Sequence, residues 1–160
     1  WIGEQCVWDS LAIAETVNER FAGGSLWPED ETLRALGRSL AAEMHSSFMA
    51  LRDALPMNCR AKGRQVEISD AVHQDIDRIT ALWAQAKEAA GSEGWLLGTW
   101  SIADAMYAPV VLRFRGYAVD LPPVARAYVE HWLRDEDLQA WIRAGEAESW
   151  VIEHEEVGVS

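Results

Sequence analysis

The sequence predicts an all-α body of about five helices, joined to a small N-terminal remnant of another structure. Apolar residues recur at spacings of three and four over most of the chain, which is the period of an α-helix. Beyond the first few residues, no segment alternates with the period of two that is typical of a strand. Hydrophobic residues make up 49% of the 160 residues, which is ample for one core.

The first elements are expected to be a short strand and two helices. Residues 1–8 leave room for one strand, and residues 10–21 have a helical pattern that Gly23-Gly24 ends. A long helix is expected from Pro28, a residue that suits the first helical turn, to Leu55, just before Pro56. One buried stripe of this helix consists of Leu33, Leu36, Leu40, Met44, Phe48, Leu51 and Leu55.

The second half of the chain predicts four more helices, which follow a loop over residues 57–68. Turn residues or caps separate them, and an acidic tail of little periodicity begins at Ser149. The expected helices run from about Val72 to Gly91, from Ser101 to about Arg115, from Asp120-Leu-Pro-Pro123 through Leu133, and from Glu136 to Glu148.

Composition excludes several classes of partner. The formal net charge of -12 argues against nucleic acid and against an anionic membrane, since both attract basic patches. Cys6 and Cys59 form no recognisable framework, so we expect free thiols in a reducing cytoplasm. The four histidines show no paired-ligand spacing, so no metal site is expected.

Asp9 and Ser10 are the first candidate binding residues. They stand at the predicted strand-to-helix turn, where a carboxylate, a hydroxyl and unpaired backbone N–H groups meet. This combination suits the zwitterionic head of an amino acid. A plain helix cap is an equal alternative, because aspartate and serine are also the commonest N-cap residues.

Two further motifs stand on predicted helices. Ser101-Ile-Ala-Asp104 is a capping box, whose expected role is helix initiation. His45 lies beside the apolar stripe of the long helix. A half-buried structural histidine is the plainer interpretation of His45, and a histidine that faces a cleft is the sharper alternative.

Together these pieces resemble the glutathione transferases. Asp9-Ser10 followed by Leu11-Ala12-Ile13 is similar to the acid–serine turn of that family, which binds glutathione. Residues 96–100 before Ser101-Ile-Ala-Asp104 resemble the context of the family's capping box. Glu43-Met44-His45 with Phe48 is similar to a stretch of bacterial beta-class enzymes.

The resemblance implies a domain division. Residues 1–21 would be the last strand and helix of a thioredoxin-like domain that binds glutathione, residues 22–27 a linker, and residues 28–160 the all-α C-terminal domain. Because the chain begins with Trp1 and only one strand precedes Asp9, we expect the upstream part of such a protein to be missing.

The resemblance also assigns site residues. Asp9 and Ser10 would hold the γ-glutamyl amine and carboxylate of glutathione. No catalytic residue is expected in this chain, although an auxiliary role at the thiol is implied for His45. The residues implied to line the pocket for the electrophile are Met44, His45, Phe48, Arg52 and Trp150.

The implied activity is conjugation of the glutathione thiol to small hydrophobic electrophiles, in a detoxifying, cytoplasmic homodimer without a metal. The residue that activates the thiol would lie upstream. We therefore expect little turnover of an aryl halide by these 160 residues alone.

Two other interpretations remain open. One is a transferase-like helical module that binds or dimerises without chemistry. The other, less favoured, is a glutathione-dependent isomerase, dehalogenase or reductase on the same fold.

Overall fold

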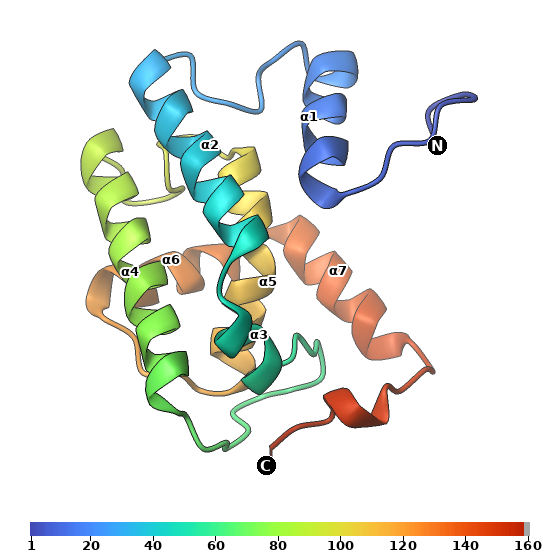
Figure 1. Ribbon diagram of the computed structural model, residues 1–160, viewed down its shortest axis with the longest axis vertical. Helices are drawn as coiled ribbons and strands as arrows, with labels where there is room; N and C mark the ends of the chain where they lie inside the picture. The colour runs from blue at the N-terminus through green and yellow to red at the C-terminus, as the bar shows by residue number, and fades with distance from the viewer. Residues whose placement is uncertain (159–160) are drawn as a thin grey trace. The chain divides into compact units, whose positions relative to one another are not determined.

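The computed structural model describes residues 1–158, and helices dominate it (Figure 1). The expected all-α architecture is confirmed. In the described part of the chain no sheet forms, and strand pairing is limited to the isolated bridges Ile2–Gln5 and Leu97–Thr99. The helices are α1 (Ser10–Phe21), α2 (Glu31–Ser46), α3 (Met49–Ala54), α4 (Asp70–Ala90), α5 (Ile102–Gly116), α6 (Pro123–Trp132), α7 (Glu136–Ala147) and the 3-10 helix η1 (Glu153–Glu155).

The chain divides into two compact units, and the cut passes through α4 and α5. The first unit contains residues 1–47 and 86–106. The second contains residues 48–85 and the chain from Tyr107 onward. The division predicted at residues 21 and 27 stays a prediction.

Two expected N-terminal features differ from the structure. The strand expected within residues 1–8 does not form, because Ile2 and Gln5 pair with each other across a tight turn. Pro28 does not begin α2. The side chain of Asp30 accepts a hydrogen bond from the Leu33 N–H at 2.8 Å and so caps a helix that starts at Glu31, three residues later than expected.

The long helix expected over residues 28–55 is broken at Ser47 and Phe48. Ser47 is extended, and Phe48 has a φ of 65°, in the left-handed region that ends a helix. Phe48 supplies no side-chain cap to α3. Asp75 of α4 takes that role instead, since its carboxylate accepts a hydrogen bond from the Leu51 N–H at 2.9 Å.

In the first unit, α1 packs against α2, and α2 approaches its neighbours closely at Gly37. A Cβ atom at Gly37 would lie 2.6 Å from Leu97 Cδ1 and 2.9 Å from the ring of Trp27. Only glycine leaves room for this contact. The buried Trp27 indole is fixed by donating to Glu15 Oε1 at 3.0 Å.

The Ser101–Asp104 motif closes the loop before α5, and the hydrogen bond expected from the Ser101 N–H to the Asp104 side chain is confirmed. The buried Asp104 carboxylate accepts from the backbone N–H of Ser101 at 2.9 Å and of Leu96 at 3.0 Å. The Ser101 hydroxyl also donates to it at 2.9 Å. Lys87, in the last turn of α4, reaches the same loop, where its amine donates to the carbonyl of Glu93 at 2.8 Å. Burial lowers the pKa of the Lys87 amine.

Trp83 lies at the centre of the second unit and is fully buried. Three aromatic rings meet it edge to face, those of Tyr107, Phe114 and Tyr128, with centroids 5.6, 5.5 and 4.7 Å away. Such pairs add about 0.5–1.5 kcal/mol each beyond area burial. This cluster joins α4, α5 and α6.

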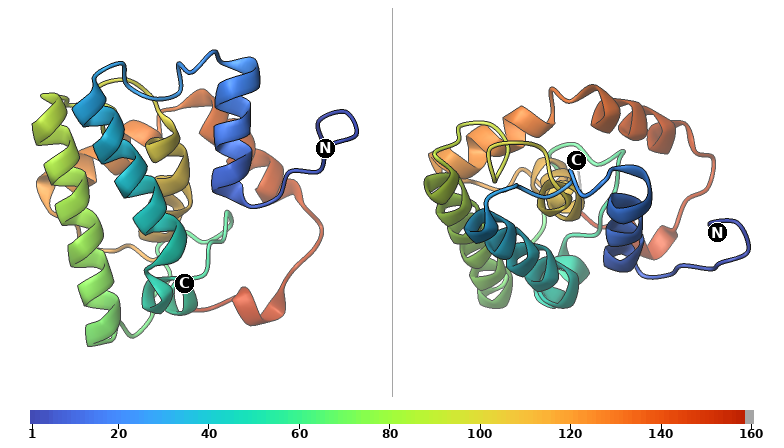
Figure 2. Two further views of the ribbon diagram at one scale, coloured as in Figure 1. Left: turned by 45° about the horizontal axis from the view of Figure 1, so that its top comes forward. Right: turned by 90° about the horizontal axis from the view of Figure 1, so that it is seen from above.

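The C-terminal tail of the second unit runs along the loop between α3 and α4 (Figure 2). Asn58 Nδ2 donates to Glu156 Oε1 at 2.8 Å, and Arg64 Nη1 donates to the Val157 carbonyl at 3.2 Å. The tail is therefore held by polar contacts rather than by a helical stripe. Among the helices of residues 1–158, none combines the length and the apolar character needed to cross a membrane.

Candidate functional site

The start of α1 is organised by the Asp9 carboxylate. Asp9 Oδ1 accepts hydrogen bonds from the backbone N–H of Leu11 at 3.0 Å and of Ala12 at 3.4 Å. Two of the N–H groups that a helix leaves unpaired at its start are thereby satisfied. The helix-cap interpretation of Asp9 is confirmed, and it describes only one of the two carboxylate oxygens.

The backbone of Asp9 is strained. Its φ of 74° lies in the left-handed region that favours glycine, whereas N-cap residues ordinarily have negative φ. Such a conformation costs about 1–3 kcal/mol and persists only where the surroundings over-determine it. Strained residues of this kind cluster at functional sites, so the observation marks Asp9 as a candidate beyond its role as a cap.

The second carboxylate oxygen of Asp9 meets His45. Nε2 of the imidazole lies 3.0 Å from Asp9 Oδ2, and the two side chains are 38% and 40% exposed. His45 stands in the last turn of α2, and both residues belong to the first unit. The structure therefore brings together two residues that the sequence singled out separately, at a place that remains open to solvent.

Ser10 occupies the first position of α1 and is exposed. Its hydroxyl makes no hydrogen bond within the described chain, so it is available to a ligand. Beside it, the positive end of the helix dipole favours an anion. Asp9 and Ser10 thus offer an acceptor for a cation next to donors for an anion, which is the pattern that a free amino-acid head requires.

Other side chains fix α1 within the first unit, and sequence analysis missed them. Asn18, on α1, is buried and accepts from the Leu26 N–H at 2.9 Å through Oδ1. The Leu26 carbonyl in turn accepts from the Ile102 N–H at 3.1 Å. The signal available in the sequence was an uncharged polar residue within the helix-patterned run that ends at Gly23-Gly24.

The residues expected to line an electrophile pocket are divided between the units. Met44 and His45 belong to the first unit, whereas Phe48, Arg52 and Trp150 belong to the second. Met44 and Phe48 are only 3% and 5% exposed, so a ligand would reach them only if neighbouring side chains moved. Trp150 is 82% exposed. The expected pocket stays a prediction.

Comparison with known proteins places the fold. No protein-family model matches the chain, and no curated protein matches it. A crystal structure of a glutathione transferase homologue from Burkholderia gl BGR1, with bound glutathione, matches it with a TM-score of 0.63 and 24% identity. The match covers 91% of this chain and 71% of that one. The chain therefore has the fold of that homologue over nearly its whole length.

Proposed function

We propose that this chain is a member of the glutathione transferase family and that Asp9 and Ser10 bind the γ-glutamyl end of glutathione. The observation that carries the proposal is Asp9, whose backbone is strained and whose half-exposed carboxylate is shared between the cap of α1 and His45. The fold it shares with a homologue that holds glutathione adds support.

The geometry suits recognition of an α-amino acid head. The γ-glutamyl amine is a cation, and a carboxylate oxygen accepts more than one hydrogen bond. Asp9 Oδ2 can therefore accept from the amine while it remains in contact with His45. The α-carboxylate of the same head would lie at the N-terminus of α1 and accept from Ser10. Charge-assisted hydrogen bonds of both signs then define the orientation of the ligand.

His45 acts here as a positioning residue. Its contact at 3.0 Å holds the Asp9 carboxylate in one orientation, with Oδ1 on the helix and Oδ2 toward α2.

In the whole protein, we propose that the bound thiol attacks a small hydrophobic electrophile, in a cytoplasmic homodimer. A thiol with an ordinary pKa near 8.5 is only a few per cent thiolate at neutral pH, so activation is the step that catalysis requires.

Calorimetric titration with glutathione, N-acetylglutathione and cysteinylglycine tests the proposal. N-acetylation removes the positive charge that Asp9 would bind, and cysteinylglycine lacks the γ-glutamyl head altogether. We expect glutathione to bind. The other two peptides should bind at least about tenfold more weakly, because each lacks at least one charge-assisted contact. Equal affinities for all three peptides would overturn the assignment.

A second candidate function is a transferase-like helical module that associates with another protein. One observation favours it. The face of α1 that carries Ile13, Val17 and Phe21 is exposed, with 45%, 37% and 69% of these residues open to solvent. Exposed apolar faces of this kind mark interaction sites. Absence of glutathione binding together with self-association would favour this alternative.

A further inference from the structure

A cavity of about 510 Å³ lies in the second unit, between the loop after α3, helix α7 and the tail. Pockets for small molecules typically measure about 300–1,000 Å³. The proposed glutathione site uses none of the residues that line it. These residues are Met57, Asn58, Cys59, Arg60, Trp141, Ala144, Gly145, Glu148, Trp150, Ile152, Glu155 and Glu156.

Helix α7 presents one face to this cavity. Trp141, Ala144 and Gly145 recur at the spacing of one helical face, and Glu148, the residue that follows the helix, continues the lining. The small residues in the middle of that face let the helix approach the loop, because a Cβ atom at Gly145 would lie 2.7 Å from Cys59 Sγ.

The walls of the cavity are aromatic and open. Trp141 on α7 is 49% exposed, and Trp150 on the tail is 82% exposed. Met57 and the exposed Ile152 add apolar surface. An open tryptophan face attracts a cation through the negative charge over its ring, and tryptophan does so most strongly among the aromatic residues.

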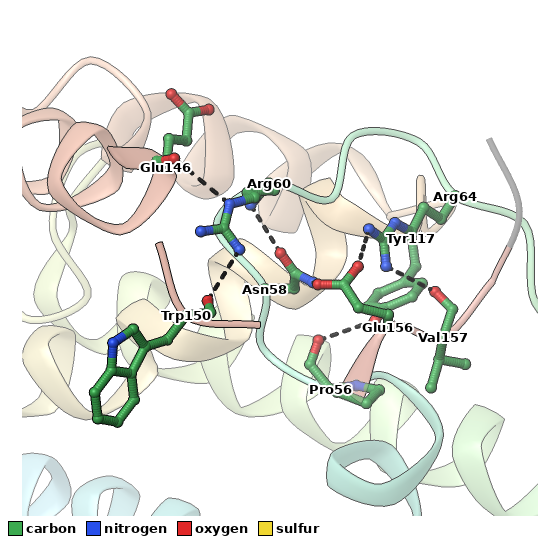
Figure 3. A network of polar contacts seen from close by, with 9 residues as sticks. All are labelled: Pro56, Asn58, Arg60, Arg64, Tyr117, Glu146, Trp150, Glu156 and Val157. Carbon is green, nitrogen blue, oxygen red and sulfur yellow. Dashed lines mark hydrogen bonds and ion pairs between the residues drawn. The ribbon is translucent and has the colours of Figure 1, made fainter. Parts of the chain in front are cut away.

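The side chains that line the cavity carry more carboxylates than cations. Three carboxylates line it, those of Glu148, Glu155 and Glu156, against the single cation of Arg60. The Arg60 guanidinium points at backbone, where it donates to the carbonyls of Glu146 at 3.5 Å and of Trp150 at 3.4 Å (Figure 3). It also donates to the carbonyl of Glu148. An anionic ligand would therefore meet carboxylates without a guanidinium to pair with.

We propose that this cavity binds a small organic cation with a flat aromatic body. The two indoles supply stacking and cation–π attraction, and the surplus carboxylates supply the complementary charge. The Glu156 carboxylate is paired with the Arg64 guanidinium and also accepts from Asn58 Nδ2, and the Glu148 carboxylate accepts from the N–H groups of Ser149 and Trp150. Glu155 supplies the third carboxylate of the lining, and His154 Nε2 lies 3.5 Å from its Oε1.

The site exists only while the tail is docked. Trp150, Ile152 and Glu155 all come from the tail, which Arg60 and Arg64 hold through backbone carbonyls and Glu156. In Figure 3 the Trp150 indole extends away from the Arg60 guanidinium while its carbonyl faces it. Fixing the tail backbone therefore leaves the aromatic ring free to contact a ligand.

Calorimetry with three probes of one size tests the proposal on the intact chain at pH 8. The probes are N-methylquinolinium, a cation; quinoline, neutral at this pH; and 1-naphthalenesulfonate, an anion. We expect the cation to bind about tenfold more tightly than quinoline, as two cation–π contacts at exposed indoles together allow, and the anion not to bind. Equal binding of the three probes would overturn the proposal.

Variants locate the binding. Trp150→Ala should weaken binding of the cation about tenfold, since it removes one aromatic wall. Trp8→Ala, which removes an exposed tryptophan from the first unit, is the matched control and should change nothing. Glu155→Gln should weaken binding of the cation about threefold and leave quinoline unaffected. An unchanged affinity in Trp150→Ala, with its circular dichroism spectrum intact, would contradict the assignment.

Discussion

Nε2 of His45 lies 3.0 Å from Oδ2 of Asp9, while Oδ1 of the same carboxylate caps α1. One aspartate thus links the start of α1 with the end of α2 inside the first unit. The carboxylate is held at both oxygens yet remains 40% exposed. A group that is fixed and still accessible is prepared for a ligand, because little ordering is left to be done on binding.

The His45 contact predicts a graded effect on glutathione affinity. His45→Ala should weaken binding about three- to tenfold, the effect of losing one hydrogen bond that orients Asp9. His45→Gln keeps an N–H donor on a side chain of similar reach and should restore most of the affinity. Calorimetry checks both variants. If the glutamine variant binds as weakly as the alanine variant, His45 does not act by orienting Asp9.

The buried Asp104 carboxylate predicts a large effect on stability. Asp104→Ala leaves the N–H groups of Leu96 and Ser101 and the Ser101 hydroxyl without their acceptor, which should lower the free energy of unfolding by about 3 kcal/mol or more. Ser101→Ala should cost about 1 kcal/mol. Urea unfolding measures both changes, and a loss under about 1 kcal/mol for Asp104→Ala would contradict this role.

The tail should be released at acid pH. Hydrogen bonds from Arg64 first, and then from Asn58, hold the pKa of the Glu156 carboxyl below its ordinary value of 4.5. The ionised Glu156 carboxylate therefore stabilises the docked tail fully above pH 4.5. This stabilisation is lost as the pH falls through the lower pKa that Glu156 has in the docked state. Amide spectra of Glu156 and Val157 should change below pH 4.5.

Glu156→Gln is the control for this acid transition, because the amide cannot ionise. Its tail should be loosened at pH 7 and should show no further change on acidification. Retention of the same acid transition in the variant would place the titrating group elsewhere.

The open face of α1 predicts self-association. Together with the N-terminal segment, this face borders a hollow of about 480 Å³, which is lined by Trp1, Ile2, Gly3, Val7, Ile13, Val17 and Phe21. Phe21→Glu should weaken the dimer at least about tenfold by placing a charge in an apolar contact. Sedimentation equilibrium measures this, with Trp150→Glu as the control in the other unit. A chain that is monomeric at every concentration would rule out this association.

Much of the fold follows from local signals in the sequence. The expected helix over residues 10–21 matches α1, and the one expected from Glu136 to Glu148 ends a residue beyond α7, because a cap and an apolar stripe mark both. The break at Phe48 carries no such signal. The stripe continues through Phe48 with the right period, and no glycine or proline stands there, so only tertiary packing explains its left-handed backbone.

The site was only partly predictable. Asp9, Ser10 and His45 could each be named from the sequence, but the contact between Asp9 and His45 joins residues far apart in the chain, which periodicity does not report. The docking of the tail escaped prediction for a related reason. Arg60 and Arg64 hold backbone carbonyls, and Glu156 is one of several acidic residues in the tail, so the sequence does not single out the contact.

The most direct measurement of the central claim is a titration of the ¹⁵N-labelled chain with glutathione, comparing the natural chain with Asp9→Asn. Asparagine keeps the capping acceptor and tolerates a left-handed backbone, so the variant removes only the charge. We predict saturable shifts of the Ser10 and Leu11 amides in the natural chain, and an affinity at least about tenfold weaker in Asp9→Asn. Equal affinities, or no response of these amides to millimolar glutathione, would contradict the account.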